Sequence, residues 1–346
     1  MRKTILRGVE RKGSTYYLNR PFPLIGHLYF GLIDRGLNII QARITSLCNL
    51  SCRFCSVDAG QSSRRIAEFM VSDPEWFSEW VDLIVSYKED EVDVLFDAAG
   101  DPVTNPLLPE FIRSTKRNRK VRWVILETRL HGATRQLIDE LAEAGLDRIN
   151  VSIDTLDAQK AAYLSGNPSY NIENVLKLVE YAFHQHGIDV HVAPVWIPGV
   201  NDHDLEEIIE WAIRNGFGRR IPPLGIQKYV VHPHGRKIQN IDEPSWEEWE
   251  SFLRRLEDKY GVKLVLSMSD YGLRKSRQFK PPLRRGDETW VIVVGEGPYQ
   301  HEFLGVTKDY KWALTLLSKK EVIEEGDIIL ARIIRDKDGI LIAVPT

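Results

Sequence analysis

All three cysteines of this 346-residue chain fall within eight consecutive positions, Cys48 to Cys55. Free cysteines that serve only in packing behave as small buried apolar residues, and they would be scattered along a sequence. Three thiols in one short stretch, spaced C-x3-C-x2-C, instead indicate metal ligation. We call residues 48–55 the cysteine loop, and we predict that it is the functional centre of the chain.

The number of thiols limits the kind of metal centre. A closed zinc site needs four ligands, and a [4Fe–4S] cluster is normally held by four cysteines. Three cysteines leave one position open for a substrate, unless a histidine or an aspartate completes the set. A zinc site completed by His27 or His131 is the alternative that the sequence leaves open.

Composition places the chain among globular proteins, with 43% hydrophobic and 27% charged residues. No apolar run reaches the roughly 18 residues of a membrane span. The basic N-terminus lacks the long apolar region and cleavage site of a signal peptide. We therefore expect a cytoplasmic protein that does not enter a membrane, while its oligomeric state cannot be predicted.

Between residue 39 and about residue 231 the chain alternates strands and helices. Strands are predicted at 39–45, 92–96, 121–126, 148–153, 188–195 and 224–231. Helices are predicted from Asp73-Pro74, near 107–117, and at 134–144, 157–164, 171–186, 202–215 and 245–260. Because each helix must cross back to start the next strand, the strands should be parallel. The expected fold class is α/β, with a partial (β/α)6 TIM-like barrel.

Folds of this class carry out their chemistry at the carboxyl ends of the strands. The cysteine loop follows the first predicted strand at that end. Small and polar residues also follow the other strands, in the segments 97–102, 127–132, 152–155, 196–199 and 227–229. We expect these segments to collect on one rim together with the cysteines.

The spacing of the cysteines, with Phe54 directly before Cys55, resembles the C-x3-C-x-aromatic-C motif of the radical S-adenosylmethionine (SAM) superfamily. The resemblance implies that Cys48, Cys52 and Cys55 hold three irons of a [4Fe–4S] cluster. It also implies that the amino and carboxylate groups of SAM bind the fourth iron.

Further segments resemble the molybdenum-cofactor-synthesis type of radical SAM protein, in the same order along the chain. Residues 99–102 (Ala-Gly-Asp-Pro) resemble the Gly-Gly-Glu-Pro loop that contacts the SAM amino group, with Ala and a shorter acid in two positions. Residues 145–156 resemble the segment whose serine contacts SAM, and residues 195–202 the bend that lies against the adenine. The resemblance implies cofactor-binding roles for Phe54, Gly100, Asp101, Ser152, Asp154 and Pro198.

The family chemistry would be reductive cleavage of SAM to methionine and a 5′-deoxyadenosyl radical, which then takes a hydrogen atom from the substrate. This implies an electron donor such as ferredoxin or flavodoxin. Candidate catalytic residues on the rim are Glu127, Arg129, Lys228 and Tyr229. Since no other thiol is present, a second cluster bound by cysteine is excluded.

The last segment, 286–346, reads as five short strands separated by turns, which predicts a small all-β barrel of the OB type. Residues 324–330 resemble the closing strand of TRAM domains, which bind tRNA in RNA-modifying radical SAM enzymes. Basic runs at 217–240 and 271–286, and basic residues within 1–38 that include Arg2 and Lys3, favour a phosphate-rich substrate.

The predicted organisation is a basic N-terminal extension or edge hairpin (1–38), a radical SAM core with its flanking helix (39–270), a basic linker (271–285) and a TRAM/OB-like barrel (286–346). The expected function is a radical SAM enzyme that modifies an RNA (tRNA) nucleoside. Two alternatives stay open. One is a small-molecule or peptide substrate, and the other is a non-catalytic Fe–S or zinc module that binds RNA.

Overall fold

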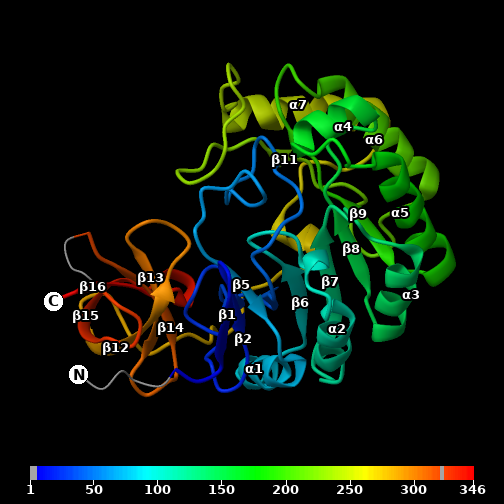
Figure 1. Cartoon of the computed structure of the whole chain (residues 1–346). Helices are drawn as coiled ribbons and strands as arrows, with labels where there is room; N and C mark the ends of the chain where they lie inside the picture. The colour runs from blue at the N-terminus through cyan, green and yellow to red at the C-terminus, as the bar shows by residue number, and fades with distance from the viewer. Residues whose placement is uncertain (1–5, 320–322) are drawn as a thin grey trace. The chain divides into compact units, whose positions relative to one another are not determined.

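The computed structural model describes residues 6–319 and 323–346 of the chain (Figure 1). The chain divides into two compact units, each built from separate stretches of sequence. The first unit holds the residues up to Leu47 together with Arg64–Arg122 and Lys275–Thr346. The second unit holds Cys48–Ser63 and Trp123–Arg274. Of the residues predicted to have a function, Arg2 and Lys3 lie outside the described part.

The first unit contains the beginning of the predicted α/β pattern. Its elements there are β3 (Gly31–Asp34), β4 (Ile39–Arg43), α1 (Pro74–Ser86), β6 (Val92–Asp97), the 3-10 turn η1 (Pro102–Thr104) and α2 (Leu108–Lys116). β4 and β6 pair in parallel, as predicted, while the unpredicted β3 pairs antiparallel with β4. Asp73 caps α1 by accepting a hydrogen bond from the N–H of Trp76 at 2.9 Å, which confirms the predicted start of this helix.

The second unit continues the pattern with parallel strands and longer helices. Its elements are β7 (Val121–Thr128), α3 (Arg135–Ala144), β8 (Arg148–Val151), α4 (Ala158–Ser165), α5 (Ile172–His186), β9 (Asp189–Val192), α6 (Asp202–Asn215) and α7 (Trp246–Tyr260). β8 pairs in parallel with both β7 and β9. The five helices confirm the predicted ones to within a residue.

The predicted fifth and sixth strands are shorter than expected. β9 ends at Val192, and the chain resumes as β10 (Val195–Trp196), which pairs in parallel with β11 (Gln227–Lys228). The reason is Pro194, which has no N–H for the ladder and so separates β9 from β10. Its carbonyl accepts the N–H of Gln227 at 2.7 Å and leads into the short pair.

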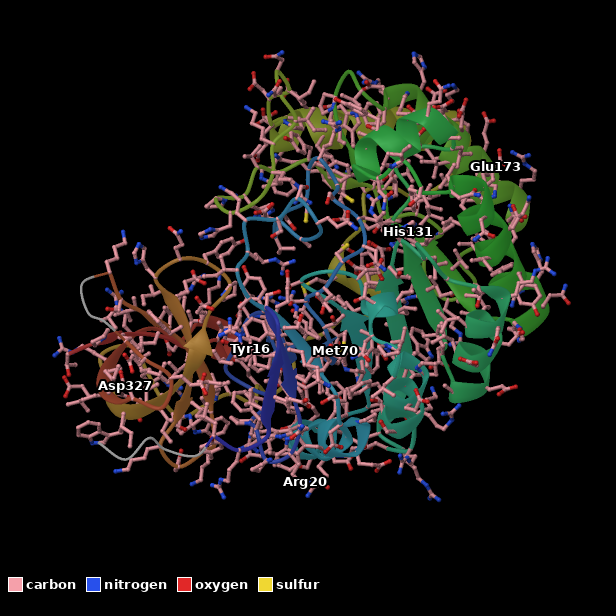
Figure 2. The ribbon with its side chains drawn as sticks, viewed as in Figure 1. Tyr16, Arg20, Met70, His131, Glu173 and Asp327 are labelled. Carbon is pink, nitrogen blue, oxygen red and sulfur yellow. The ribbon has the colours of Figure 1, made fainter. Side chains whose placement is uncertain are left out.

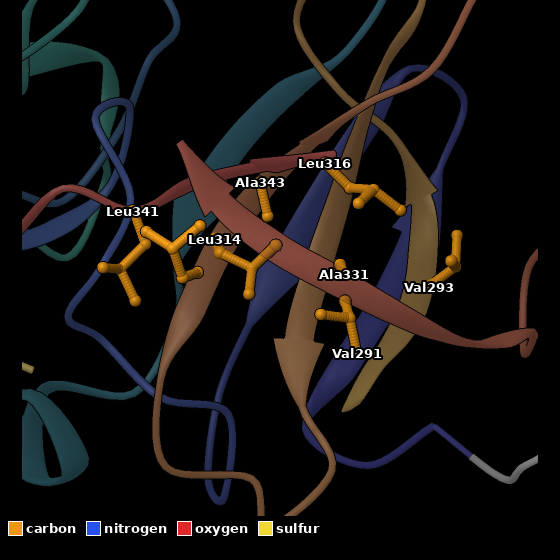
Figure 3. Close-up of a cluster of buried hydrophobic side chains, with 8 residues drawn as sticks. Val291, Val293, Leu314, Leu316, Ala331, Leu341 and Ala343 are labelled. Atoms are coloured by element: carbon orange, nitrogen blue, oxygen red, sulfur yellow. The ribbon is translucent and has the colours of Figure 1, made fainter. Parts of the chain in front are cut away.

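The predicted C-terminal barrel is confirmed as a closed barrel of five strands. The strands are β12 (Glu288–Glu296), β13 (Glu302–Thr307), β14 (Ala313–Leu317), β15 (Ile328–Arg335) and β16 (Ile342–Pro345), in the order β12-β13-β14-β16-β15. Alternate residues of each strand fill its interior, among them Val291, Leu314 and Ala331, all fully buried (Figure 3). Closure leaves the barrel without an open edge strand.

The barrel packs against the N-terminal segment within the first unit. β1 (Val9–Lys12) and β2 (Thr15–Leu18) form a hairpin, and β2 pairs in parallel with β5 (Glu68–Val71). Tyr16, which is labelled in Figure 2, accepts the N–H of Glu296 with its hydroxyl at 3.0 Å. Ala313 donates its N–H to the carbonyl of Ile25 at 2.9 Å.

Gly26 marks the closest approach between these two parts, because a Cβ there would collide with the carbonyl of Ala313. Two forms were expected for residues 1–38, and the described part of this segment contains the hairpin, which β1 and β2 form. Two basic side chains of this described segment already have acidic partners, since Arg11 pairs with Glu296 at 2.7 Å and Arg20 pairs with Glu79.

Residues 275–285 of the basic linker belong to the first unit and are likewise held there. Lys88 is only 2% exposed and donates to Asp34, which is 3% exposed, at 2.7 Å. Lys88 also donates to the carbonyl of Arg277 at 2.8 Å, and Asp34 accepts the N–H of Phe279 at 2.8 Å. Within the described residues, no helix is long and apolar enough to cross a membrane.

The first prediction concerns this buried ion pair. Lys88→Met should lower the stability of the chain by about 3–5 kcal/mol, because it leaves the Asp34 carboxylate buried without its cation. Denaturant unfolding followed by circular dichroism measures the loss. Lys12→Met is the control, since the Lys12 side chain is 63% exposed and its contacts, with Glu10 and the ring of Tyr17, lie at the surface. Equal shifts for both variants would contradict the prediction.

Candidate active site

The cysteine loop has no helix or strand of its own and is held by the end of α4. Cys48, Cys52 and Cys55 are half-buried free thiols. The backbone N–H groups on either side of Cys52 donate to α4: Ser51 to the carbonyl of Ser165 and Arg53 to that of Leu164, both at 2.9 Å. The loop is therefore attached to a helix end on both sides of its central cysteine.

Arg236 holds the other side of the cysteine loop. Its Nε donates to the carbonyl of Cys52, and its two terminal nitrogens donate to Asp58 and to the carbonyl of Ala59, all at 2.7 Å. The N–H of Arg236 also donates to the carbonyl of Cys55 at 2.9 Å. The sequence suggested a phosphate-binding role for this arginine. That interpretation is wrong for Arg236, because its guanidinium is used in binding the loop.

The sulfur atoms lie in surroundings that suit thiolate ligands. Cys48 Sγ accepts the N–H of Leu50 at 3.4 Å, and Cys55 Sγ accepts the N–H of Ala59 at 3.3 Å. Hydrogen bonds to sulfur are one of the means by which proteins tune iron–sulfur clusters. Burial raises the pKa of the Cys52 thiol, and the charge of Arg129 acts in the opposite direction. The donor set and its hydrogen bonds therefore fit a cluster held by three cysteines.

Across the described residues, no three Cys, His, Asp or Glu side chains already form a metal-ligand group. The three thiols must turn toward one another when a cluster binds. His27 does not serve the zinc alternative, because it is fully buried in the first unit, with its ring centroid 4.4 Å from that of Phe30. Burial lowers the pKa of His27 to about 3. His131 (Figure 2) has Nε2 3.4 Å from the Asn167 amide nitrogen.

Arg129 and Asp154 form an ion pair at the carboxyl ends of β7 and β8. Asp154 also accepts the N–H of Val195 at 2.9 Å. The Arg129 guanidinium lies 5.6 Å from the ring centroid of Phe54. Burial opposes the charge of Arg129, but Asp154 and Cys52 raise the pKa of Arg129 well above its ordinary value. The pair thus connects two strand ends to the surroundings of the central cysteine.

Ser152 and Pro198 are placed at the same strand ends. Ser152 follows β8 and donates its N–H to the carbonyl of Thr128 at 3.0 Å, while its hydroxyl forms no hydrogen bond to the described residues. Pro198 is half-buried in the bend after β10. That bend is fixed by Asn201, whose side-chain oxygen accepts the N–H of Ile197 at 2.8 Å. Cofactor binding by Ser152 and Pro198 stays a prediction.

Lys228 and Tyr229 have structural partners. Lys228 donates to Glu243 at 2.6 Å and lies 5.2 Å from the ring centroid of Trp246. Tyr229 is 1% exposed, and its hydroxyl accepts the N–H of Ile238 at 3.1 Å. Its ring packs in one apolar cluster with Phe54, Leu164, Ile197 and Ile238. These contacts support the apolar cluster that packs against Phe54. A catalytic role for Lys228 or Tyr229 stays a prediction.

Gly100 and Asp101 lie in the first unit, on the turn that follows β6. A Cβ at Gly100 would collide with the carbonyl oxygens of Ser46 and Leu47, so only glycine fits. Asp101 donates its N–H to the carbonyl of Leu47 at 2.8 Å. Its carboxylate caps η1 by accepting the N–H of Val103 at 3.1 Å. This turn therefore packs on the residue that directly precedes Cys48.

A row of polar residues on β7, β8 and β9 was not predicted as a group. The strand register places Glu127 opposite Asn150, and Asn150 opposite His191. Asn150 accepts a hydrogen bond from Arg148 at 3.0 Å. His191 has Nδ1 2.7 Å from the carbonyl of Pro222, and burial lowers its pKa to about 4, so the ring is neutral near pH 7. The sequence feature that could have indicated this row is the pair of polar residues at alternate positions 148 and 150 of the strand.

The family model that matches the chain is that of the radical SAM superfamily, over residues 43–212. This span contains the cysteine loop, the turn at Gly100 and the strand ends that carry Arg129 and Asp154. The chain belongs to the radical SAM superfamily. It is an enzyme of that group, whose cofactors are a [4Fe–4S] cluster and SAM.

Two relatives illustrate how far the similarity extends. “Uncharacterized protein MJ0103” of Methanocaldococcus jannaschii is 35% identical, over 98% of this chain and 82% of the relative. A “Probable GTP 3′,8-cyclase” of Archaeoglobus fulgidus is 26% identical, over 71% of this chain and 75% of that protein.

Solved structures support the fold. The FeFe-hydrogenase maturase HydG of Carboxydothermus hydrogenoformans is 15% identical, with a TM-score of 0.51 over 63% of this chain and 50% of that one. SuiB of Streptococcus suis is 14% identical, with a TM-score of 0.50 over 65% of this chain and 47% of that one. This radical SAM chain spans about half of each. The likeness confirms a partial TIM-like α/β fold, and a TRAM or OB identity for the C-terminal barrel stays a prediction.

The second prediction concerns Arg236. After anaerobic reconstitution, Arg236→Gln should lose iron to a chelator roughly tenfold faster than the unchanged chain, because the cysteine loop then lacks one side-chain hydrogen bond at Cys52 and the residues just after it lack two, at Asp58 and Ala59. The decay of the cluster's visible absorbance measures this rate. Arg220→Gln is the matched control from the same basic run, since its guanidinium is 40% exposed and 3.6 Å from Asp147. Iron loss at the same rate from both variants would contradict the role of Arg236.

Proposed function

We propose that this chain cleaves SAM reductively at a single [4Fe–4S] cluster and uses the resulting 5′-deoxyadenosyl radical to take a hydrogen atom from its substrate. The observation that carries the proposal is the cysteine loop. It contains every thiol of the sequence and is held by α4 and Arg236. When bound, the cluster and SAM supply the electron transfer and the radical.

The residues of the second unit prepare the site in three ways. The N–H groups of Leu50 and Ala59 donate hydrogen bonds to two of the sulfur atoms, those of Cys48 and Cys55. Arg129 brings a permanent positive charge beside Cys52, which offsets part of the negative charge of a thiolate-bound cluster. Asp154 holds Arg129 and the backbone of Val195 together, so that the loop and the β10 bend keep a fixed geometry.

The SAM-binding residues remain part of the proposal. Phe54, Gly100, Asp101, Ser152, Asp154 and Pro198 are the candidates. The open hydroxyl of Ser152 makes it the most direct candidate for a hydrogen bond to SAM. Asp154 is already engaged by Arg129 and Val195, and Asp101 already caps η1, so we assign both to positioning. A cytoplasmic setting also belongs to the proposal, because thiolate ligands require reduced cysteines.

The third prediction tests this function directly. Anaerobically reconstituted protein should contain about four irons per chain and release 5′-deoxyadenosine when SAM and a strong reductant are added. Cys52→Ala should lose both iron and product, because one of three ligands is gone. Iron analysis and chromatography of the nucleoside measure the two quantities. Tight zinc binding without any cleavage of SAM would contradict the proposed function.

We retain a nucleoside in RNA as the proposed substrate, although fewer basic residues are open for phosphate binding than the sequence suggested. The basic residues of the 217–240 run already have partners: Arg219 over Phe183, Arg220 at Asp147, Lys228 at Glu243, Arg236 at Asp58 and Lys237 at Asp242. In the linker, Lys275 and Arg285 are exposed and form no ion pair with a described residue. Arg277 and Arg284 are also exposed without an ion pair to a described residue, but they contact the Tyr87 ring and backbone carbonyls. Lys275 and Arg285 are therefore the best remaining candidates for phosphate binding near the barrel.

A free nucleotide is the second candidate. It is favoured by the relatives whose names describe action on GTP. It is also compatible with the polar row, because Glu127 can accept hydrogen bonds and the Asn150 amide can donate one. Both candidates contain a nucleoside, and they differ in whether an RNA chain must be bound around it.

The fourth prediction separates the two candidates. If RNA is the substrate, K275E combined with R285E should weaken tRNA binding and reduce its salt dependence by up to about two charges, because each cation neutralises one phosphate. Electrophoretic shifts at several salt concentrations measure this change. Unchanged tRNA binding, together with nucleotide-dependent release of 5′-deoxyadenosine, would reject RNA in favour of the free nucleotide.

A further inference from the structure

A basic hollow of about 460 Å³ lies beside the cysteine loop in the second unit. Its lining includes Ser51, Arg53, Tyr163, Arg236, Lys237 and Gln239. Three of these side chains are cationic, and the described lining contains no carboxylate. None of the functions assigned above uses this surface, apart from the attachment of the loop by Arg236.

The cations of the basic hollow are only partly neutralised. Arg53 donates from Nε to the carbonyl of Tyr163 at 2.9 Å, with its guanidinium 4.1 Å from the ring centroid, and it forms no ion pair with a described residue. Lys237 is 3.2 Å from Asp242, whose side chain is 98% exposed and therefore well screened by water. Arg236 is balanced by the buried Asp58. The surface keeps a net positive charge.

The basic hollow is adjacent to the central cysteine along the chain. Ser51 and Arg53 directly precede and follow Cys52. Arg236 donates to the carbonyl of Cys52 from the same lining. A protein seated on this surface would therefore lie next to the backbone that carries the Cys52 thiol. Tyr163, 48% exposed, adds an apolar contact of the kind that aromatic residues supply at interfaces.

We propose that the basic hollow docks an acidic one-electron donor protein with a flavin or iron–sulfur centre. This inference rests on the proposed function, which needs one electron from outside the chain for each cleavage of SAM. In the transfer, the donor is oxidised by one electron and the cluster is reduced by one, with no bond or proton changed. Complementary charge steers such an encounter and accelerates it at low salt.

A neighbouring surface of opposite charge supports the choice of occupant. The hollow around Pro198 is lined by Asp242, Glu243, Glu247 and Glu248, with Arg255 as its cation. An acidic partner is repelled there and attracted to the basic hollow. Attraction to the basic hollow and repulsion from the acidic one would thus orient the donor as it approaches the cysteine loop.

The test compares two routes to the reduced cluster. The reconstituted full chain is reduced either by an acidic flavodoxin or by titanium(III) citrate, and the ratio of the two rates is the readout. K237E should lower this ratio roughly threefold to tenfold at low salt, and the difference should disappear at high salt as the charges are screened. Q239E adds one negative charge to the same lining and should act in the same direction. K177E, on the exposed surface of α5, is the matched control for charge.

Each outcome bears on the proposal. An equal ratio for K237E, Q239E and K177E would overturn it. A ratio that is unchanged while the KM for the substrate rises would overturn it too, and would make the basic hollow a subsite for a substrate phosphate. Should titanium(III) citrate fail to support any cleavage of SAM, the proposed function itself fails, and that result differs from every outcome that concerns docking alone.

Discussion

The arrangement of the candidate site depends on the hydrogen bonds that Arg236 donates to the cysteine loop and to the residues just after it. The loop lacks regular secondary structure, and its backbone groups are satisfied largely by partners outside it. Arg236 provides a planar fork of donors that stays charged at any relevant pH, and it satisfies two carbonyls and the buried Asp58 together. Lysine could not reproduce this geometry, because its ammonium is a single point of charge on a flexible stem. The position of the central thiol is therefore set by a residue more than 180 positions away in sequence.

Arg129 and Asp154 extend the same principle to the strand ends. The pair is buried, and its two members come from successive βα connections. A buried ion pair adds little net stability on average, but breaking it is costly, so it fixes geometry more than it lowers energy. Here it keeps a carboxylate, a guanidinium and the β10 bend in one arrangement beside Cys52. Arg129, a predicted catalytic residue, and Asp154, a predicted cofactor-binding residue, thus also hold the site in shape, and their predicted roles stay predictions.

The sequence was sufficient for elements defined by local patterns. Helix caps such as Asp73, the period of the barrel strands and the cysteine spacing all depend on neighbouring residues. The structure confirms the helix and the barrel, and the family match confirms the family that the cysteine spacing indicated. Contacts between residues that are distant in sequence could not be predicted from it. Arg236 appeared only as one charge in a basic run, and nothing nearby in sequence points to Cys52 or Asp58. The polar row of Glu127, Asn150 and His191 likewise exists only through strand register.

The contact of Ile25 and Gly26 with Ala313 and Leu341 has a consequence for the order in which the chain acquires its structure. These hydrogen bonds join segments separated by almost the whole sequence, so the first unit cannot be completed until its last strands have been synthesised. The contacts of α4 to α7 and of the strands between them are all available earlier. Since parts of a chain tend to fold as units during synthesis, and distant contacts slow folding, the unit with the cysteine loop can mature first. Iron could thus be inserted into a nascent chain in which Ile25 and Gly26 still lack their hydrogen-bond partners, Ala313 and Leu341.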